Sequence, residues 1–329
     1  MIGFLLRRML QSFAVLLAVA FVAFAMFNFV GDPVAGMVGP DTSIAEREVL
    51  RERLGLNRSS VGQYLAYLGN VAQGDFGRSY RTAEPVARLI LSRVPASVEL
   101  SLVGALFAFT VGVLAGVYCG LHPRRWLARI IMAVSLVGVS LPTFLIGILL
   151  IVAFSVALPW LPSFGRGAVV ELGWWNTGFL TWSGLKSLIL PSVTLGLFQM
   201  ALIMRLVRAE MLEVLRTDYI RFARARGLSD RAVHFRHALK NTLVPVITVA
   251  GLQLGALIAF TIVTETVFAW PGIGQLFVQS VQSADIPVMA SYLVMVGLIF
   301  VLINLVVDLL YFRSEEHTSE LQSHVRISY

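Results

Sequence analysis

The sequence predicts an all-α integral membrane protein with about six transmembrane helices. Composition is the first reason: of its 329 residues, 57 % are hydrophobic and only 14 % are charged, whereas a soluble domain carries about a quarter charged residues. The mean hydropathy of +0.79 is the second reason. The formal charge of +7 does not indicate a nucleic-acid partner, because arginines also accumulate on the cytoplasmic side of membrane proteins.

Apolar stretches of suitable length are the third reason, since a helix needs about 20 residues to cross the hydrocarbon core. The predicted spans are Met9–Val30, Leu100–Leu121, Ile130–Leu158, Leu188–Met204, Leu243–Val263 and Val288–Val307. The first follows Arg7 and Arg8 and is too long for a signal peptide, so residues 1–30 are interpreted as a retained anchor helix. Pro142 interrupts the third span and Pro191 lies near the start of the fourth. A break beside a transport path and a simple packing kink are both open.

The positions of the basic residues orient the chain. With the N-terminus in the cytoplasm, most basic residues beside the spans fall on the inner side. They are Arg7, Arg8, Arg124, Arg125, Arg129 and the run from Arg205 to Lys240. The long outer segment after the first span holds eight arginines, but segments of this length escape the rule. Both termini are therefore predicted to be cytoplasmic.

Residues 31–96 are predicted to form a small helical extracytoplasmic segment. Ser43 and Glu46 make a capping box at the start of a helix that ends at Gly55. The stretch SVGQYLAYLGNVAQG then predicts a second helix, which brings three apolar side chains onto one face. These are Tyr64, Leu65 and Leu68.

A turn-rich joint, GDFGRSY, and a short helix beginning at Pro85 complete this segment. The segment is expected to cap the outer ends of the spans. Docking of a partner and shielding of the span ends are both open roles.

Small residues recur at intervals of four in two spans. Gly112, Gly116 and Gly120 do so in the second span, and Gly251 and Gly255 in the fifth. This spacing lets helices approach closely. Close packing and chance in a glycine-tolerant environment are equally weighted interpretations.

Three carboxylates lie close to predicted span ends, where water can reach them: Glu99, Glu265 and Asp308. Ionisable residues near spans are functional candidates by default, but structural pairing is the favoured role for each. The single cysteine, Cys119, lies in an apolar run and cannot form a disulfide within the chain.

The basic stretch DYIRFARARGLSDRAVHFRHALKN, residues 218–241, lies on the cytoplasmic side between the fourth and fifth spans. Its first part predicts a short helix with Tyr219, Phe222, Ala223 and Arg226 on one face. Gly227 is a natural C-terminal cap. Ser229 can then cap a second helix, with Asp230 in its first turn. The pattern is helix, glycine turn, helix.

Three interpretations of this stretch compete. A basic loop that contacts anionic headgroups explains the arginines but not the capped turn. A DNA-binding helix-turn-helix is disfavoured because membrane spans tether both ends. A rigid docking helix for a cytoplasmic protein, framed by steering arginines, is the favoured interpretation. His234 and His237 have metal-ligand spacing, but no Cys or carboxylate of suitable spacing accompanies them, so no metal site is predicted.

YIRFARARGLSDRAVHFRHALKNTLVPVITVAG resembles the cytoplasmic-loop signature of ABC-importer permeases of the dipeptide, oligopeptide and nickel branch. Arg221-Phe222-Ala223 stands where the general pattern has Glu-Ala-Ala, a departure usual for this branch, and Gly227 matches the following glycine. The Leu-x-Pro ending at Leu243–Pro245 comes five residues later than in the general pattern. Further similar motifs are GDPV, LRERLGLNRSSVGQYLAYL, GDFGRSY, SRVPASVELSL and ETVFAWPGIGQL. The resemblance covers about residues 1–312.

This resemblance implies a multi-pass subunit of the bacterial cytoplasmic (inner) membrane. It implies residues 97–312 as a five-helix permease core, with a cytoplasmic coupling loop at 205–242. The expected partners are a second related permease subunit, two cytoplasmic ATPase subunits, an extracytoplasmic solute-binding protein and membrane lipids. The implied ATPase-coupling helix consists of Tyr219, Arg221, Phe222, Ala223, Arg224, Ala225, Arg226 and Gly227.

The chain is not expected to be an enzyme. A phosphate-binding loop needs a lysine after glycine, but the two lysines, Lys186 and Lys240, each follow leucine. ATP and Mg²⁺ are therefore expected on the partner ATPase, and no cofactor is expected on this chain. Phe222 and Ala223 are expected to form the packed face, with the arginines around them.

Peptides are the expected substrate, with nickel or another small solute as the alternative. A secondary transporter or channel is the alternative from another class. It is disfavoured because neither coupling charges inside the membrane nor an internal repeat is found. No substrate-binding residue is assigned. Residues 313–329 are polar and unlike the preceding span, and are interpreted as a non-native tail, such as translated adaptor sequence, with a genuine tail as the alternative.

Overall fold

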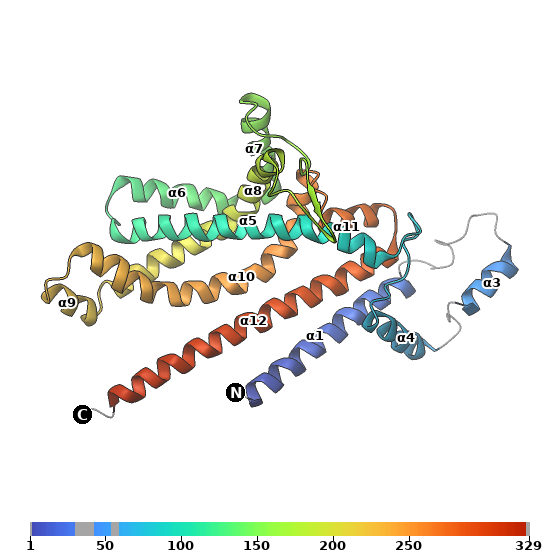
Figure 1. The fold of residues 1–329 in the computed structure, drawn as a ribbon, viewed down its shortest axis with the longest axis horizontal. Coiled ribbons are helices and arrows are strands. Elements are labelled where there is room, and N and C mark those ends of the chain that lie inside the picture. Colours follow the sequence, from blue (N-terminus) through green and yellow to red (C-terminus); the bar gives the residue numbers. More distant parts are fainter. Residues whose placement is uncertain (1, 30–42, 54–58, 327–329) are drawn as a thin grey trace. The chain divides into compact units, whose positions relative to one another are not determined.

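The computed structural model describes residues 2–29, 43–53 and 59–326 (Figure 1). Side chains are described within these ranges except at 2–5, 27–29, 50, 51, 53, 252, 254–256, 258–260 and 308–326. The described chain is almost entirely helical. It divides into two compact units, each built from segments distant in sequence. The first comprises Met1–Ser97, Glu171–Asn176 and Pro271–Leu302; the second comprises Val98–Val170, Thr177–Trp270 and Ile303–Tyr329.

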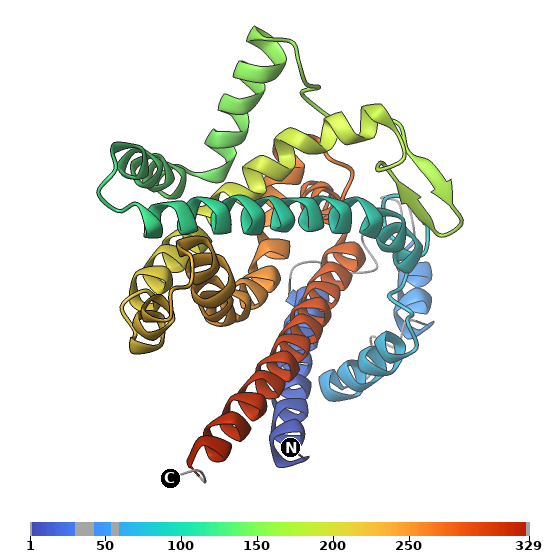
Figure 2. The same ribbon diagram turned by 60° about the vertical axis from the view of Figure 1, so that its left-hand side comes forward.

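The first unit contains α1 and the short helices that follow it, together with the start of the last helix. Its helices are α1 (Ile2–Phe29), α3 (Ile44–Arg53), α4 (Ser60–Ala72), α11 (Ile273–Gln282) and α12 (Ile286–Arg326) as far as Leu302. Figures 1 and 2 both show α1 running beside the first part of α12. A Cβ added to Gly297 would lie 3.0 Å from the Val19 side chain, so these two helices pack closely here.

A buried carboxylate organises one corner of the first unit. Asp285, only 3 % exposed, lies between α11 and α12. It accepts hydrogen bonds from the Ser79 hydroxyl and from the backbone N–H of Tyr80 at 3.1 Å. Because Ser79 and Tyr80 belong to the predicted joint GDFGRSY, this carboxylate fixes the joint to the turn between α11 and α12.

The second unit is a helical bundle with a small two-stranded hairpin. Its elements are α5 (Val86–Leu121) from Val98 on, α6 (Trp126–Ser140), α7 (Thr143–Ile151), η1 (Val152–Ala157), α8 (Trp182–Val214), α9 (Asp218–Ala225), η2 (Ala232–Ala238) and α10 (Leu239–Val267). The strands β1 (Val170–Leu172) and β2 (Trp175–Thr177) pair in the connection between η1 and α8. α8 packs against α5, α6, α7 and α10 and is the central helix of the unit.

Glycines bring α5 against α8, as the spacing predicted. A Cβ on Gly116 would lie 2.7 Å from both the Met204 carbonyl oxygen and the Val207 Cβ. The corresponding atoms on Gly112 and Gly120 would approach α8 to 2.9 and 2.8 Å. The close-packing interpretation is therefore confirmed for these three glycines. In the fifth predicted span, Gly251 faces Val307 in the same way, at 3.1 Å; the surroundings of Gly255 lie outside the described side chains.

The prediction of membrane-crossing helices is confirmed in its coarse form. Among the described residues, four single helices are long and apolar enough to span a bilayer. These stretches are Leu6–Met26, Val86–Leu121, Trp182–Val214 and Ile286–Val307. α6 and α7 together make a fifth candidate, but they meet at 110°. α10 covers the predicted fifth span as one 29-residue helix.

Pro142 breaks the third predicted span completely. Leu141 leaves the helical region, with φ −89° and ψ 140°, and Pro142 is the N-cap of α7, which begins at Thr143. Proline disfavours the helical conformation of the residue before it, which explains why α6 ends here. The result is a sharp turn rather than a kink.

The segment before the second span differs from its prediction. The short helix expected from Pro85 is the first part of α5, which continues through Pro95 to Leu121 without a break. The capping box at α3 is confirmed, since the Ser43 N–H donates to Glu46 Oε2 at 3.1 Å and the Glu46 N–H donates to Ser43 Oγ at 3.3 Å. The predicted stop at Gly55 lies outside the described residues.

The structure confirms pairing for the first of the three candidate carboxylates but contradicts its access to water. Glu99 is 1 % exposed and forms an ion pair with Arg166 at 2.6 Å. Its Oε2 also accepts the N–H of Gly178 at 3.2 Å. Glu265 is fully buried as well, and Asp308 lies outside the described side chains. The fold therefore buries Glu99 and Glu265, although the sequence places both near span ends.

Candidate functional site

The short helix predicted at the start of the basic stretch is present as α9 (Asp218–Ala225), and it ends as its sequence predicts. Arg226 is the last residue near the helical region, and Gly227 follows with φ +78°. The N–H of Gly227 donates to the Arg224 carbonyl at 2.9 Å, and the N–H of Leu228 donates to the Ala223 carbonyl at 3.3 Å. These two bonds form a Schellman motif, which fixes the direction in which the chain leaves the helix.

Glycine is required at position 227 by the backbone conformation and not by a lack of space, because a Cβ there would meet no atom within 4 Å. A residue with a side chain must adopt the left-handed conformation, which costs about 1 kcal/mol for alanine and less for asparagine. We expect Gly227→Ala to speed amide hydrogen exchange in α9 by about fivefold, and Gly227→Asn to speed it less. Gly138→Ala, on α6 in open space, is the control. Unchanged exchange in Gly227→Ala would contradict this role.

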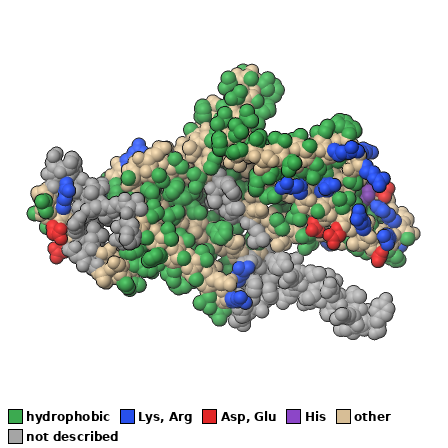
Figure 3. Space-filling model, turned by 180° about the vertical axis from the view of Figure 1, so that it is seen from behind, with side chains coloured by type: hydrophobic (Ala, Val, Ile, Leu, Met, Phe, Trp, Pro, Cys, Tyr) green, Lys and Arg blue, Asp and Glu red, His purple; other side chains and the backbone are tan. Residues whose placement is uncertain are grey.

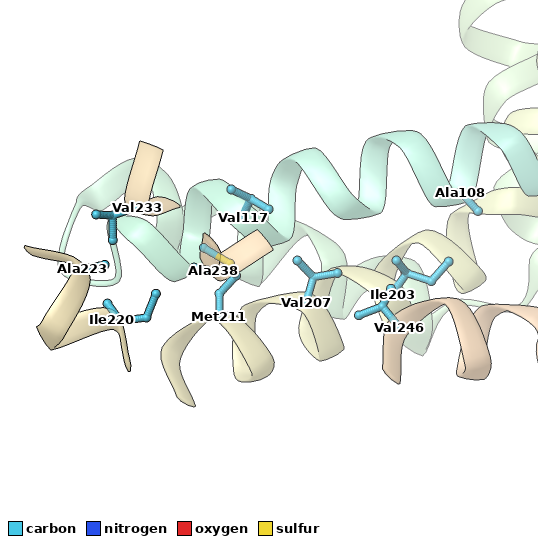
Figure 4. Close-up of a cluster of buried hydrophobic side chains, with 10 residues drawn as sticks. All are labelled: Ala108, Val117, Ile203, Val207, Met211, Ile220, Ala223, Val233, Ala238 and Val246. Carbon is cyan, nitrogen blue, oxygen red and sulfur yellow. The ribbon is translucent and has the colours of Figure 1, made fainter. Parts of the chain in front are cut away.

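One face of α9 is anchored to the second unit. Ile220 is fully buried and Ala223 is 7 % exposed. Figure 4 shows both side chains at one end of a buried cluster, at the end where Val233 and Met211 lie. The buried cluster consists of Ala108, Val117, Ile203, Val207, Met211, Ile220, Ala223, Val233, Ala238 and Val246. α9 therefore packs on a buried cluster that α5, α8, η2 and α10 share, and it is not a free loop segment.

The opposite face of α9 is exposed and carries an aromatic side chain. Phe222 is 64 % exposed, and the Arg226 guanidinium lies over its ring at 5.7 Å. Tyr219 is 40 % exposed, and its hydroxyl accepts a hydrogen bond from the Asn241 amide at 2.6 Å. We call Tyr219, Phe222 and Arg226 the outer face of α9.

Basic side chains surround this outer face. Arg221, Arg224 and Arg226 are all exposed, as is Ala225. Arg221 pairs with Asp218 at 3.2 Å, but both side chains are largely in solvent, so the pair contributes little to stability. Figure 3 shows Lys and Arg side chains gathered over the end of the second unit that carries α9. This arrangement suits an acidic or polar partner surface.

The second helix begins at the predicted cap and then widens into a π-helix. The N–H of Ala232 donates to Ser229 Oγ at 3.4 Å, and the π-helical turn η2 follows directly. π-helical turns are rare and occur often at functional sites. Burial lowers the pKa of His234, Asp230 opposes this, and Arg224 and His122 add to the lowering. The imidazole is therefore expected to be neutral at pH 7.

The structure separates two residues that the sequence placed on one packed face. Phe222 points outward, whereas Ala223 packs inside its own chain, so Ala223 is not available to a partner. Ile220, the main anchor of α9, was not among the residues predicted from the sequence. The signal was present, because Ile220 and Ala223 are three residues apart and Ile220 is the one aliphatic residue larger than alanine in α9.

Comparison with known proteins identifies the family. Residues 112–319 match the family described as the inner membrane component of binding-protein-dependent transport systems. Residues 1–101 match the N-terminal family of the same type of membrane component. The chain belongs to this family. It is thus a multi-pass component of the inner membrane. Members of this family form the membrane part of transporters and are not themselves catalytic.

Alignments with relatives cover nearly the whole chain of this inner membrane component. The dipeptide transport system permease protein DppB of Alkalihalophilus pseudofirmus is 40 % identical over 324 residues. The di/tripeptide transport system permease protein DppB of Pseudomonas aeruginosa is 41 % identical over 325 residues. The oligopeptide transport system permease protein AppB of Bacillus subtilis is 39 % identical over 313 residues. Each alignment covers 94 % of this chain and 97 % of the relative.

The fold is also found in solved transporters. The MetNI methionine ABC transporter, in an inward-facing conformation, has a chain that matches with a TM-score of 0.54 and 21 % identity. The match covers 68 % of this inner membrane component and 95 % of that chain. This similarity establishes the fold of the membrane subunit.

Proposed function

We propose that this chain is a permease subunit of an ATP-driven importer of dipeptides and oligopeptides. The observation that carries the proposal is the set of peptide permeases that align with 94 % of the chain at 39–41 % identity. The exposed outer face of α9 supports it, because such an importer needs a surface that receives force from an ATPase.

The proposed topology has six crossings and two cytoplasmic termini. The bent pair α6–α7 counts as the third crossing and α10 as the fifth, in addition to the four single helices. The basic residues around α9 favour a cytoplasmic location for this end of the second unit. A second related permease subunit would supply the other half of the translocation path.

The proposed coupling site is the outer face of α9, together with its arginines. Two ATPase subunits would bind ATP and Mg²⁺ and seat this face in a cleft of their own, while a solute-binding protein delivers peptide from outside. Ile220 and Ala223 tie α9 to three long helices, so a displacement of α9 moves those helices with it. A helix packed in this way transmits motion as a rigid body, since packed cores do not deform continuously.

Phe222→Ala tests the coupling site. We expect this variant to fold normally, because the ring is 64 % exposed, but to lose peptide-stimulated ATPase activity by at least about tenfold. Phe144→Ala on α7, where the ring is 49 % exposed, is the matched control and should keep its activity. The assay uses the full transporter reconstituted with its ATPase subunits and binding protein. Equal activity of both variants would place the coupling surface elsewhere.

The substrate is tested in the same reconstituted system. We expect ATPase activity to rise when the binding protein is loaded with dipeptides or oligopeptides. A response to nickel alone would support an ATP-driven importer but show that its substrate is nickel and not peptide. Absence of any ATPase binding by the chain would remove the coupling role of α9.

A further inference from the structure

α4 has an unusual composition for a helix of an extracytoplasmic segment. No residue between Ser59 and Gly74 is charged. Two of its aliphatic side chains are largely exposed: Val61 is 69 % and Leu65 is 61 % exposed. With the half-buried Leu68 they recur at i, i+4 and i+7, so they form one continuous stripe along the helix. We call Val61, Leu65 and Leu68 the α4 stripe.

A neighbouring face of α4 packs on α1 and differs from the predicted face. The Tyr64 ring lies 5.8 Å from the Phe21 ring and 5.4 Å from the Phe24 ring. Tyr67 lies 6.0 Å from Phe24. Leu65, predicted to share a face with Tyr64, points away from these contacts. Figures 1 and 2 show α4 beside the second half of α1, not beyond its end.

A hydrogen bond fixes the depth of α4 along the α1 span. The Tyr64 hydroxyl donates to the Leu17 carbonyl at 2.8 Å. Leu17 lies eleven residues from the start and nine from the end of the apolar stretch Leu6–Met26. At 1.5 Å per residue these separations are about 16 and 14 Å, so Leu17 lies near the centre of a hydrocarbon core about 30 Å thick. Phe21 and Phe24 then lie within one leaflet.

We propose that α4 lies against the acyl chains of the leaflet that holds the second half of α1, with the α4 stripe inserted among them. In the topology proposed above this is the outer leaflet. The hydroxyl of a tyrosine in hydrocarbon needs a partner, and the Leu17 carbonyl supplies it.

Acyl chains are the occupant that the neighbouring surface favours. The α1 stretch is itself mostly uncovered, with only 11 % of its most apolar part buried, so this surface of a membrane span is available to lipid. Because α4 rests directly on Phe21 and Phe24, the α4 stripe continues this lipid-facing surface. Burying Val61 and Leu65 in hydrocarbon stabilises each by about 1.5–3 kcal/mol relative to water. The absence of charge between Ser59 and Gly74 removes the main cost of insertion.

Cysteine labelling tests this location, since Cys119 is the only cysteine of the chain. In a Cys119→Ser background, Val61→Cys and Leu65→Cys are compared with two controls in liposomes. Ile44→Cys on α3, 86 % exposed, reports water, and Val22→Cys on α1, 54 % exposed, reports lipid. We expect the α4 cysteines to react with a charged maleimide at least about tenfold more slowly than Ile44→Cys, because apolar surroundings raise the pKa of a thiol.

A second measurement separates lipid from protein as the cover. Each cysteine carries an environment-sensitive fluorophore, attached in detergent before reconstitution, and nitroxide groups are placed on the lipid acyl chains. Quenching at positions 61 and 65 as strong as at position 22 supports insertion. Fast maleimide labelling, or slow labelling without quenching, would overturn the proposal; the second result would assign the α4 stripe to a protein partner. Neither outcome depends on the transported substrate.

Discussion

Replacing Glu99 with leucine is expected to lower the melting temperature of the purified chain by roughly 5–15 °C. Glu99 and Arg166 are 1 % and 7 % exposed and pair at 2.6 Å. Removal of one partner leaves a buried charge without its counter-ion, which costs about 3–5 kcal/mol. Glu99→Gln should be milder, since an amide oxygen can still accept the N–H of Gly178.

The damage should begin in the connection between η1 and α8. Arg166 belongs to this connection, and its neighbour Gly167 has no room for a Cβ, which would lie 2.7 Å from the Ser183 backbone. Loss of the ion pair therefore frees a segment that otherwise folds back onto the start of α8. Limited proteolysis of residues 159–181 should reveal this opening before the helices unfold.

The exposed pair of Asp218 and Arg221 is the control. Its side chains are 96 % and 72 % exposed, so Asp218→Asn should change the melting temperature by no more than about 1–2 °C. A double-mutant cycle with Glu99→Ala and Arg166→Ala should give a smaller loss than the sum of the single losses. Additive losses, or an unaffected Glu99→Leu, would show that the pair does not stabilise the native state.

Patterns that are local in sequence predicted their structures well. The cap at Gly227, the capping box at Ser43 and the glycine repeat of α5 depend on residues a few positions apart. Such patterns indicate which backbone groups at a helix end need a hydrogen bond, and which helix face carries only small residues and so allows close packing. For the two caps, the hydrogen-bond partners can be predicted without knowledge of the rest of the chain. The glycine repeat predicts close packing but not the helix against which α5 packs.

Features that depend on distant contacts could not be predicted. Glu99 is buried because Arg166 and Gly178, 67 and 79 positions away, close over it. α9 turns Ile220 inward because a buried cluster that includes Val233 and Met211 receives it there, whereas periodicity alone allowed the face with Phe222 as well. α4 lies along α1 because Tyr64 reaches Leu17, 47 positions earlier. Helical periodicity gives faces, but tertiary packing chooses among them.

Replacing Gly116 with valine is expected to disrupt the core of the second unit. A Cβ at this position would lie 2.7 Å from the Met204 carbonyl oxygen, and a backbone atom cannot move aside without its helix. α5 and α8 must therefore separate, at a cost of about 1–3 kcal/mol or more. Gly116→Ala should show a smaller loss in the same direction. Thermal unfolding of the purified chain measures both.

Gly138→Val is the matched control, because it makes the same substitution in a helix where a Cβ meets nothing within 4 Å. It should leave the melting temperature nearly unchanged. The effect of Gly116→Val should also reach α9, since Val207, which a Cβ at Gly116 would displace, belongs to the cluster that holds Ile220. At a temperature where the variant is still folded, hydrogen exchange in α9 should already be faster than in Gly138→Val. If stability falls while exchange in α9 stays the same, the α5–α8 contact stabilises the second unit without holding α9, and η2 is the element that holds α9 in place.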